Sequence, residues 1–506
     1  MDDQNKNLIL ATALSFLVIL VWFLLFPPEE PETPVTTDSP TATAPVDGVA
    51  PAPPAATDGV APTPPTLAEP ATDPNAVRDT LLAGVDRLDI DTERLTGSIS
   101  LIGGRIDDLL LKDYRETLDA DSPIVTLLSP VGSSSAYYAL YGWAPGGDLD
   151  FDAVPGANTP WALESGSELD IGAPITLVWD NGAGLIFRRT LSIDENYLFT
   201  VTQSVENTTD QTVRMAPYGL VARHGEPETI NFFILHEGVV RMSDGILEQI
   251  KYNKMPDMPF VAREGAPAEE IAVTENGWIG FTDKYWMTTL IPTPGQPFTS
   301  VAKYVPGAGI YQTEARMPTM TIAPGETADN SSYLFAGAKE WEAIRDYQRD
   351  KGIERFIDSI DWGWFFFLTK PIFWLLHEIN ILIGNMGWSI IVLTLILKAL
   401  LFPLAYKSYV SMAKMKELQP QMEKLKEQAG DDKQKMQQGM MELYKKEKVN
   451  PAAGCLPILL QIPIFFSLYK VIFVTIELRH AAWLGPFRDL SAPDPTSIIN
   501  LFGLLP

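Results

Sequence analysis

The sequence predicts a multi-pass α-helical membrane protein with a large extracytoplasmic antiparallel β-sandwich domain and a cytoplasmic helical hairpin. Three observations lead to this class: an unbroken apolar run of 19 residues at 8–26, recurring strand patterns from about residue 78 to 337, and two apolar stretches beyond residue 384. With 506 residues, the chain has room for several domains. Its formal net charge of −26 argues against nucleic acid as the main partner.

Residues 1–26 predict an N-terminal transmembrane signal anchor. The apolar run is longer than the core of a typical signal peptide, and the acidic, proline-containing residues 27–30 follow it in place of a small-residue cleavage site. A cleaved signal peptide is the alternative. Residues 27–77 are rich in Pro, Ala, Thr and Asp and contain no Lys or Arg, which predicts a disordered, extended linker.

Residues 78–337 predict the β-sandwich domain. Turn signals such as 180–184 and 207–210 separate short segments in which apolar and polar residues alternate, and Gly103-Gly104 is a further predicted turn. Many short strands at this spacing are typical of an antiparallel sandwich. The segments are 97–102, 175–179, 185–192, 197–205 and 212–221.

Residues 338–383 connect this domain to the membrane spans. A helix is predicted over 338–360. A dense aromatic group follows, interrupted by Lys370, Pro371, His377 and Glu378. Such a mixture favours an amphipathic helix at the level of the lipid headgroups, and an additional transmembrane helix is the alternative. The aromatic residues are Trp362, Trp364, Phe365, Phe366, Phe367, Phe373 and Trp374.

Two further spans are predicted at 384–406, where Pro403 is expected to end the helix, and at 451–476, which contains Pro457 and Pro463. Prolines are tolerated in membrane helices when neighbouring groups satisfy the freed backbone. Between the spans, residues 407–448 hold ten Lys against seven Asp or Glu. The positive-inside rule therefore places this loop and the N-terminus in the cytoplasm, with the β-sandwich and the loop at 477–506 on the other side.

The cytoplasmic segment 407–450 predicts a helical hairpin. Apolar residues form one stripe before Gly430, an N-cap is expected at 431–432, and a second stripe follows. Because methionine is unbranched and soft, the stripes suit an adaptable contact surface for apolar ligands. Packing of the two stripes against each other is the alternative. The methionines proposed for this contact are Met412, Met415, Met422, Met436 and Met440.

Lys398 lies inside an otherwise apolar run, Ser389 to Phe402, and no Asp or Glu occurs between Gly387 and Ala405. A charge at the centre of a membrane helix costs about 2.5–3.5 kcal/mol on insertion scales. Snorkelling of the long side chain to an interface is one explanation. A functional buried charge is the other.

Few motifs indicate catalysis. The single cysteine, Cys455, excludes a disulfide framework within the chain, and no P-loop, G-x-G-x-x-G or H-E-x-x-H pattern occurs. We therefore expect no catalytic residue, no metal and no cofactor. Ser411 with Lys414 and Ser467 with Lys470 match the short S-x-x-K pattern, so a membrane-anchored Ser–Lys hydrolase is one alternative function. A tethered carbohydrate-binding β-sandwich protein is another.

Several segments together strongly resemble the YidC family of bacterial membrane protein insertases, which has mitochondrial and chloroplast relatives. The anchor, linker and β-rich domain resemble the Gram-negative form. The resemblance implies an insertase and chaperone of the bacterial inner membrane. Its clients would be nascent membrane proteins in the lipid bilayer, with the Sec translocon and ribosome–nascent chain complexes as partners and no nucleic-acid specificity. The segments are 385–390, 411–415, 418–420, 430–434, 441–445, 447–451 and 454–465.

The resemblance also implies a hydrophilic groove within the membrane that opens to the cytoplasm and the lipid. Lys398 aligns with the basic residue facing this groove, where a well-known member of the family has arginine. Thr394, one turn earlier, and Gln461, on the facing span, are candidate polar lining residues. The family core has five spans, so the chain as given is expected to lack the last three. Candidates for an apolar slide along which a client helix moves, with ordinary packing as the alternative, are Leu456, Pro457, Leu460, Phe465 and Leu468.

Overall fold

In the computed structural model, two large antiparallel sheets build the domain between residues 87 and 338. The structure describes residues 74–119, 121–229, 232, 234–430, 432–447, 449, 456–484 and 487–491. The predicted anchor at 1–26 lies outside these residues, as do the linker up to residue 73 and the segment from residue 492 onward.

The first sheet has 11 strands. Its central path is β1 (Arg87–Asp91), β2 (Leu95–Ser100), β3 (Arg105–Arg115), β5 (Tyr137–Gly146), β10 (Val213–His224), β18 (Ile310–Arg316), β17 (Phe298–Val305), β14 (Ala266–Val273) and β13 (Phe260–Val261). Beside this path, β4 (Ile124–Leu128) pairs with β3, and β19 (Met320–Ile322) pairs with β10.

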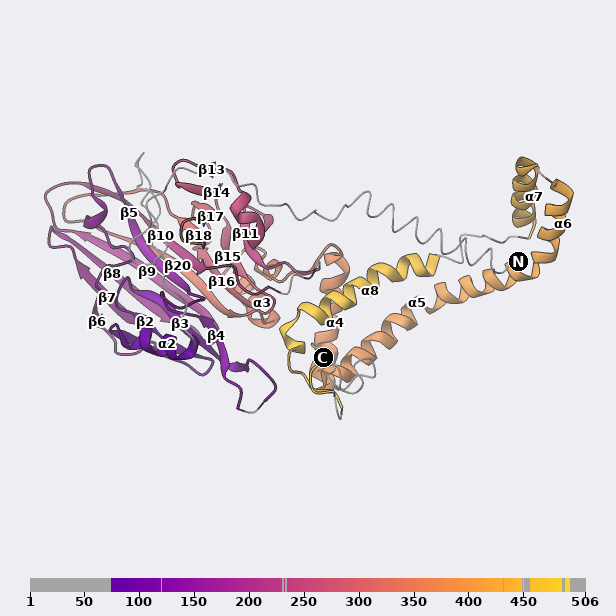
Figure 1. Ribbon diagram of the computed structural model, residues 1–506, viewed down its shortest axis with the longest axis horizontal. Helices are drawn as coiled ribbons and strands as arrows, with labels where there is room; N and C mark the ends of the chain where they lie inside the picture. The colour runs from indigo at the N-terminus through magenta and orange to yellow at the C-terminus, as the bar shows by residue number, and fades with distance from the viewer. Residues whose placement is uncertain are drawn as a thin grey trace. The chain divides into compact units, whose positions relative to one another are not determined.

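The second sheet has nine strands and faces the first (Figure 1). The strands lie in the order β12 (Ile246–Lys251), β11 (Gly238–Ser243), β15 (Gly277–Thr282), β16 (Trp286–Pro292), β20 (Thr327–Ala338), β9 (Leu198–Asn207), β8 (Leu185–Ile193), β7 (Ile175–Asp180) and β6 (Ala162–Ser165). The predicted β-sandwich is therefore confirmed, and each strand segment named from the sequence corresponds to a strand within a few residues.

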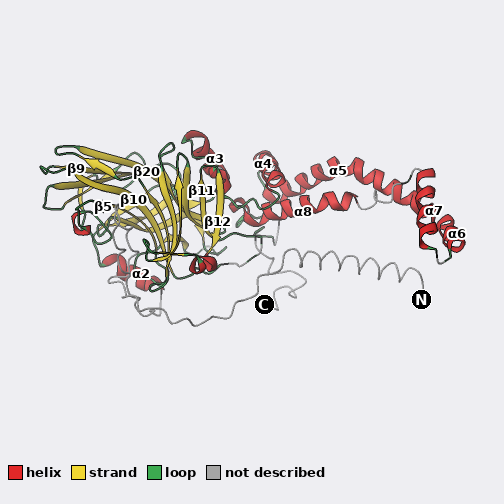
Figure 2. Cartoon of the chain, turned by 90° about the horizontal axis from the view of Figure 1, so that it is seen from above, coloured by secondary structure: helices red, strands yellow, loops and turns green. Residues whose placement is uncertain are grey.

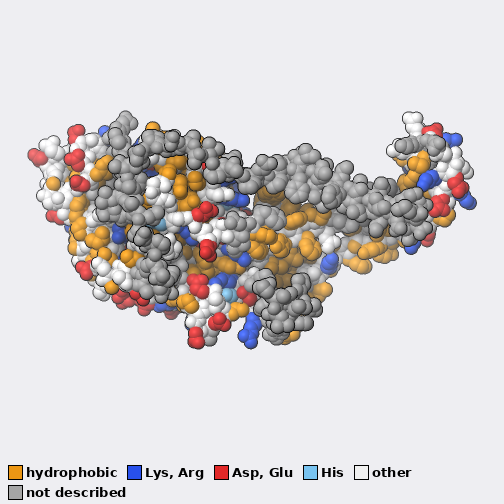
Figure 3. Space-filling view, viewed as in Figure 1, with side chains coloured by type: hydrophobic (Ala, Val, Ile, Leu, Met, Phe, Trp, Pro, Cys, Tyr) orange, Lys and Arg blue, Asp and Glu red, His pale blue; other side chains and the backbone are white. Residues whose placement is uncertain are grey.

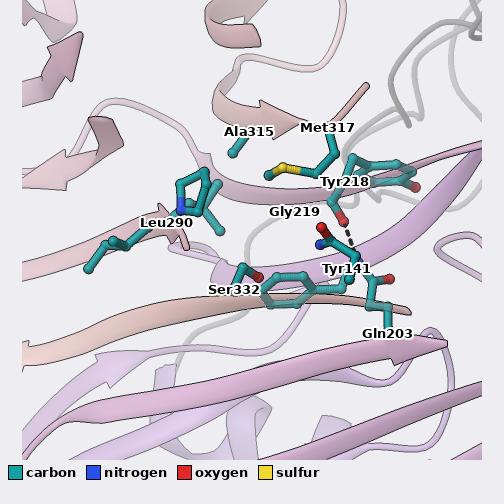
Figure 4. A pocket seen from close by; sticks show the side chains of 11 residues that line it. Tyr141, Gln203, Tyr218, Gly219, Leu290, Ala315, Met317 and Ser332 are labelled. Carbon is teal, nitrogen blue, oxygen red and sulfur yellow. Dashed lines mark hydrogen bonds between the residues drawn. The ribbon is translucent and has the colours of Figure 1, made fainter. Parts of the chain in front are cut away.

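Buried and half-buried residues alternate along the strands, and this explains why the two sheets pack face to face. In β8, every second residue from Leu185 to Ile193 is buried, which places Phe187, Arg189 and Leu191 between the sheets. A small cavity of about 10 Å³ remains between the sheets, on the order of one water molecule (Figure 4). Beside it, the Gln203 amide of β9 donates to the carbonyl oxygen of Tyr218 in β10 at 3.2 Å.

The connection from the domain to the membrane helices differs from the predicted single helix over 338–360. Strand β20 continues to Ala338, α3 covers only Trp341–Asp350, and a 3-10 turn, η3, follows at Phe356–Ser359. Gly352 interrupts the helical path because its φ of +70° lies in the left-handed region, which glycine adopts without steric cost. The prediction of one continuous helix was wrong.

Long helices follow: α4 (Phe366–Ile383), α5 (Met386–Glu417), α6 (Gln419–Ala429), α7 (Lys433–Lys446) and α8 (Leu456–Val474), with η5 (Ile476–Leu478) after α8. Helix α2 (Pro74–Ala83) and the short turns η1 (Phe151–Ala153) and η2 (Tyr252–Asp257) complete the described elements. Within this part of the chain, α4 and α5 are long and apolar enough to cross a membrane by length and composition, and 459–474 of α8 is a shorter apolar helix.

Helix α5 does not end at Pro403 as predicted. It continues for 32 residues, from Met386 to Glu417, with Pro403 inside it. Proline lacks one backbone donor, but the hydrogen bonds of the turns before and after it keep the helix continuous. The predicted span therefore shares one helix with the start of the first stripe, Met412 and Met415, whereas Met422 of the same stripe lies on α6.

Candidate functional site

Helices α4, α5 and α8 pack together where α5 begins and α8 ends. The Asn385 side chain caps α5 by accepting from the backbone N–H of Trp388 at 3.2 Å, and the rings of Trp388 and Trp483 lie 5.8 Å apart. Ser389 and Leu393 of α5 are buried near this end. The buried side chains that are described in α8 are Ser467, Lys470, Val471 and Val474.

Away from this packed end, α5 and α8 run side by side (Figures 1 and 2). Leu395 and Leu400 of α5 are 63% and 71% exposed, and Leu459 and Phe465 of α8 are 60% and 66% exposed. Figure 3 shows hydrophobic side chains gathered over these helices. The two helices thus form a pair that is packed at one end and presents apolar side chains along the rest of its length.

The predicted polar lining residues lie on this pair. Lys398 is exposed on α5, and no hydrogen bond or ion pair joins it to another described residue. Thr394 is half-buried one turn earlier, and its hydroxyl donates to the carbonyl oxygen of Ile390 at 2.8 Å. Gln461 is half-buried on α8. The structure places these residues on neighbouring helices, without a direct bond among the three in the described region.

The predicted slide residues divide into two groups. Leu460 and Phe465 are exposed on α8, at 45% and 66%, as a lipid-facing or client-facing surface requires. Pro457 is half-buried, and Leu468 packs against the core shared with α4 and α5. Leu456 begins α8, but its side chain lies outside the described set.

The hairpin formed by α6 and α7 has a small core of its own. Leu418, Leu443 and Val449 are buried, and Met415, Met422 and Leu425 pack against them. The turn agrees with the predicted N-cap: the carboxylate of Asp432 accepts from the backbone N–H groups of Gln434 and Lys435, whereas Asp431 lies outside the described residues. Met436 and Met440 are half-buried, and Met412 is 38% exposed. For Met415 and Met422, the structure thus shows packing between helices.

The geometry gives no support to Ser–Lys catalysis at the second S-x-x-K match. The Lys470 ammonium lies 2.6 Å from the carboxylate of Asp361 and also donates to the carbonyl oxygen of Ile234. The buried hydroxyl of Ser467 has no hydrogen-bond partner among the described residues. A Ser–Lys mechanism needs the lysine to take the proton of the serine, and here the lysine is bonded elsewhere. At the first match, Ser411 and Lys414 lie near the end of α5, with Lys414 exposed.

Sequence reasoning missed the partner of Lys470. A lysine in an apolar helix signals the need for a counter-charge, but Asp361 is 109 positions away among aromatic residues. Further titratable groups lie near this pair: burial lowers the pKa of Lys339 to about 8 and that of His236 to about 4. No group of three or more His, Cys, Asp or Glu suited to hold a metal ion occurs in the part of the chain that the structure describes.

A β-sandwich of this size joined to long apolar helices defines a membrane protein with a large domain outside the bilayer. A sequence profile described as the YidC periplasmic domain matches residues 87–375, and a second, described as the 60Kd inner membrane protein, matches 378–505. The chain is 69% identical to a membrane protein insertase YidC from Dinoroseobacter shibae over 506 residues, 82% of that relative's length. It is 64% identical over 522 residues to a membrane protein insertase YidC from Ruegeria pomeroyi, and the match again covers 82% of that relative's length. The chain therefore belongs to the YidC family of membrane protein insertases.

Solved structures give weaker likenesses. A crystal structure of an active YidC insertase matches 81% of this chain and 77% of the other chain, with 18% identity and a TM-score of 0.28. A galactose mutarotase-related enzyme from Lactobacillus acidophilus matches 50% of this chain and 97% of its own, with 11% identity and a TM-score of 0.33. Both scores are below 0.5, so neither likeness supports an argument about function.

Proposed function

We propose that this chain inserts nascent membrane proteins into the bilayer and helps them fold, using the neighbouring faces of α5 and α8. The observation that carries the proposal is the placement of Lys398. Its side chain is exposed on an apolar helix that lies beside a second apolar helix, and its ammonium makes no hydrogen bond or ion pair with any other described residue. The names of the relatives, which are 58–69% identical, support insertion over the hydrolase and carbohydrate-binding alternatives.

The charge of Lys398 would attract an acidic or polar segment of the client. Two opposite charges 4 Å apart interact with about 4 kcal/mol at an effective dielectric constant near 20. Lysine acts as a compact point charge, so the attraction does not need the planar geometry of arginine. Thr394 and Gln461 would line the same polar path. Apolar parts of the client would move along Leu460, Phe465 and the other proposed slide residues into the lipid.

We place the N-terminus and the α6–α7 hairpin in the cytoplasm, and the β-sandwich in the periplasm. The excess of lysine between the two apolar stretches supports this orientation. The exposed faces of Trp364, Phe366, Phe367 and Trp374 support a lipid-contacting role for α4 at the headgroup level. The Sec translocon and ribosome–nascent chain complexes are the proposed partners, and the methionines of the hairpin are the proposed contact for clients arriving from the cytoplasm.

Growth of an insertase-depleted bacterial strain tests this function. The full-length protein should restore growth, and so should Lys398→Arg, which keeps the charge, and Ser411→Ala, which removes a candidate nucleophile. Lys398→Glu should fail, because it repels acidic client segments. Lys407→Glu is the matched control, since Lys407 is exposed on the same helix; it should restore growth. Rescue by Lys398→Glu together with failure of Ser411→Ala would contradict the proposal and favour the hydrolase.

A further inference from the structure

The end of α8 is tied to two other segments of the chain by a buried ion pair. Lys470 and Asp361, whose side chains are 7% and 13% exposed, bring their charged atoms to 2.6 Å. The same carboxylate oxygen accepts from the backbone N–H of His236 at 2.9 Å, and the other accepts from Gly363 at 3.1 Å. Lys470 also donates to the carbonyl oxygen of Ile234. The pair therefore joins α8, the loop before β11, and the segment that leads into α4.

Aromatic contacts surround this pair. The ring centroid of Phe232 lies 4.9 Å from that of Phe473 and 6.3 Å from that of Tyr469, and the ammonium of Lys284 lies 4.1 Å from the centroid of Phe473. Gly363 leaves space for the side chain of Lys470, because a Cβ atom at position 363 would lie only 3.3 Å from Cε of Lys470. Gly363 also has a φ of +70°, in the left-handed region that favours glycine. The β-sandwich thus contacts α8 through apolar and charged groups at the same place.

The residues just after α8 add two more attachments. The carboxylate of Glu477 accepts from the backbone N–H of Trp341, the first residue of α3, at 3.1 Å. Arg479 donates to the carbonyl oxygen of Arg115, at the end of β3, at 2.6 Å and lies 5.3 Å from the ring centroid of Trp286. The end of α8 is therefore held to the domain over several residues.

Before Ser467, no side chain of α8 makes an ion pair or hydrogen bond to the β-sandwich in the described region. From Leu459 to Phe466 its side chains are exposed or half-buried, and burial begins at Ser467. The distance along the helix from Lys470 to Leu456 is about 20 Å at 1.5 Å per residue. A small change of the angle of α8 at Lys470 therefore produces its largest displacement at the far end of the helix.

We propose that Asp361 and Lys470 are positioning residues for insertion: their ion pair sets the angle of α8 against the β-sandwich and α4, and thereby the separation of α8 from α5. The pair touches no client; it acts through the helix that carries Gln461 and Phe465. This inference rests on the proposed function, because the separation matters only if a client passes between the helices. It assigns to the β-sandwich the role of a rigid support for α8.

The packing at Ser467 provides a readout that does not depend on insertion. A single reporter thiol is made by Ser467→Cys in a Cys455→Ser background, and its alkylation by N-ethylmaleimide is followed in membranes. With the native pair, the thiol should react slowly because Ser467 is 1% exposed. Lys470→Met and, separately, the isosteric Asp361→Asn should each speed alkylation by about tenfold or more, because a buried charge loses its partner and the local packing opens.

The charge-exchanged double variant, Asp361→Lys with Lys470→Asp, should restore slow alkylation and most of the insertion yield. Lys370→Met is the matched control: the Lys370 side chain is 33% exposed, and its partner Asp358 keeps a second ion pair, with Arg355 at 2.7 Å, so this change should leave alkylation unchanged. Unchanged alkylation in both Lys470→Met and Asp361→Asn overturns the positioning role. If alkylation responds as expected but the native protein does not restore growth of the depleted strain, the proposed function fails and the structural coupling stands.

Discussion

The hydroxyl group of Thr394 donates a hydrogen bond to the backbone carbonyl of Ile390, with the two oxygens 2.8 Å apart. A threonine hydroxyl has one proton, so this bond to the preceding turn leaves only its acceptor lone pairs for other partners. Thr394 lies one turn before Lys398, and it can accept from water or from the ammonium but cannot donate to a client while this bond persists. The charge of Lys398 is therefore the dominant polar feature of this face of α5.

Replacing Thr394 by valine should change insertion only slightly. Valine keeps the shape and loses a hydroxyl whose proton is already used within α5, so the yield of a single-span client with an acidic tail should stay within about twofold of the native value. Protease protection of the inserted client measures the yield. A loss comparable to that of Lys398→Glu would show that the hydroxyl contacts the client directly.

The stability of the α6–α7 hairpin should depend on Leu443 and not on its exposed neighbour Met441. Leu443 is buried between α6 and α7, so Leu443→Ala should destabilise the hairpin by about 2–5 kcal/mol. Limited proteolysis of the full chain in membranes measures this as faster cleavage in the Lys-rich segment. Met441, 54% exposed on the same helix, is the control, and Met441→Ala should leave the cleavage rate unchanged. Equal rates for the two variants would mean that the helices do not pack as described.

Arg189 should be critical for the β-sandwich although it contacts no client. Its guanidinium lies between the sheets, donates to the carbonyl oxygens of Gly103 and Gly104 at 3.0 and 2.9 Å, and stacks 4.5 Å from the centroid of Trp161. Burial lowers its pKa to about 10. Arg189→Met leaves buried carbonyls without donors, so the free energy of unfolding should fall by about 3 kcal/mol or more.

Thermal unfolding of the full chain in detergent, followed by tryptophan fluorescence, measures the effect of Arg189→Met. The control is Arg188→Met on the same strand, because Arg188 points outward to Glu164 and Glu206 with its side chain 33% exposed. That change should stay within about 0.5 kcal/mol of the native value. A similar loss in both variants would contradict the inward placement of Arg189.

Stability should fall in mild acid because two histidines are buried. Burial lowers the pKa of His224 and of His236 from 6.5 to about 4. The folded state therefore binds fewer protons than the unfolded state, so the stabilisation is complete above pH 6.5 and is lost as the pH falls towards 4. For His224 the difference is on the order of 3 kcal/mol. Between pH 7.5 and 4.5, the melting temperature of the double variant His224→Gln with His236→Gln should fall less than that of the native protein. An equal fall in both proteins would refute this.

The strands were accessible to prediction because their pattern is local. Residues 175–178, 185–193 and 199–207 alternate between buried and half-buried positions, and one face of each strand must meet the opposite sheet. The helix over 338–360 was predicted wrongly because Gly352 takes a left-handed conformation that composition does not specify. Pro403 was expected to end α5, but the hydrogen bonds of the flanking turns outweigh the one donor it lacks.

The sequence by itself determined the class of this protein: apolar stretches, a lysine-rich segment between two of them, and alternating strands are local properties that water and lipid act on directly. It also singled out Lys398, since a charge in an apolar run is visible without coordinates. Only the tertiary structure decided that Lys470 meets Asp361, that Met415 and Met422 pack within the hairpin, and that Arg189 holds carbonyl groups between the sheets. These outcomes depend on which surfaces come together over long sequence distances, and a buried charge takes whichever partner that packing brings within reach.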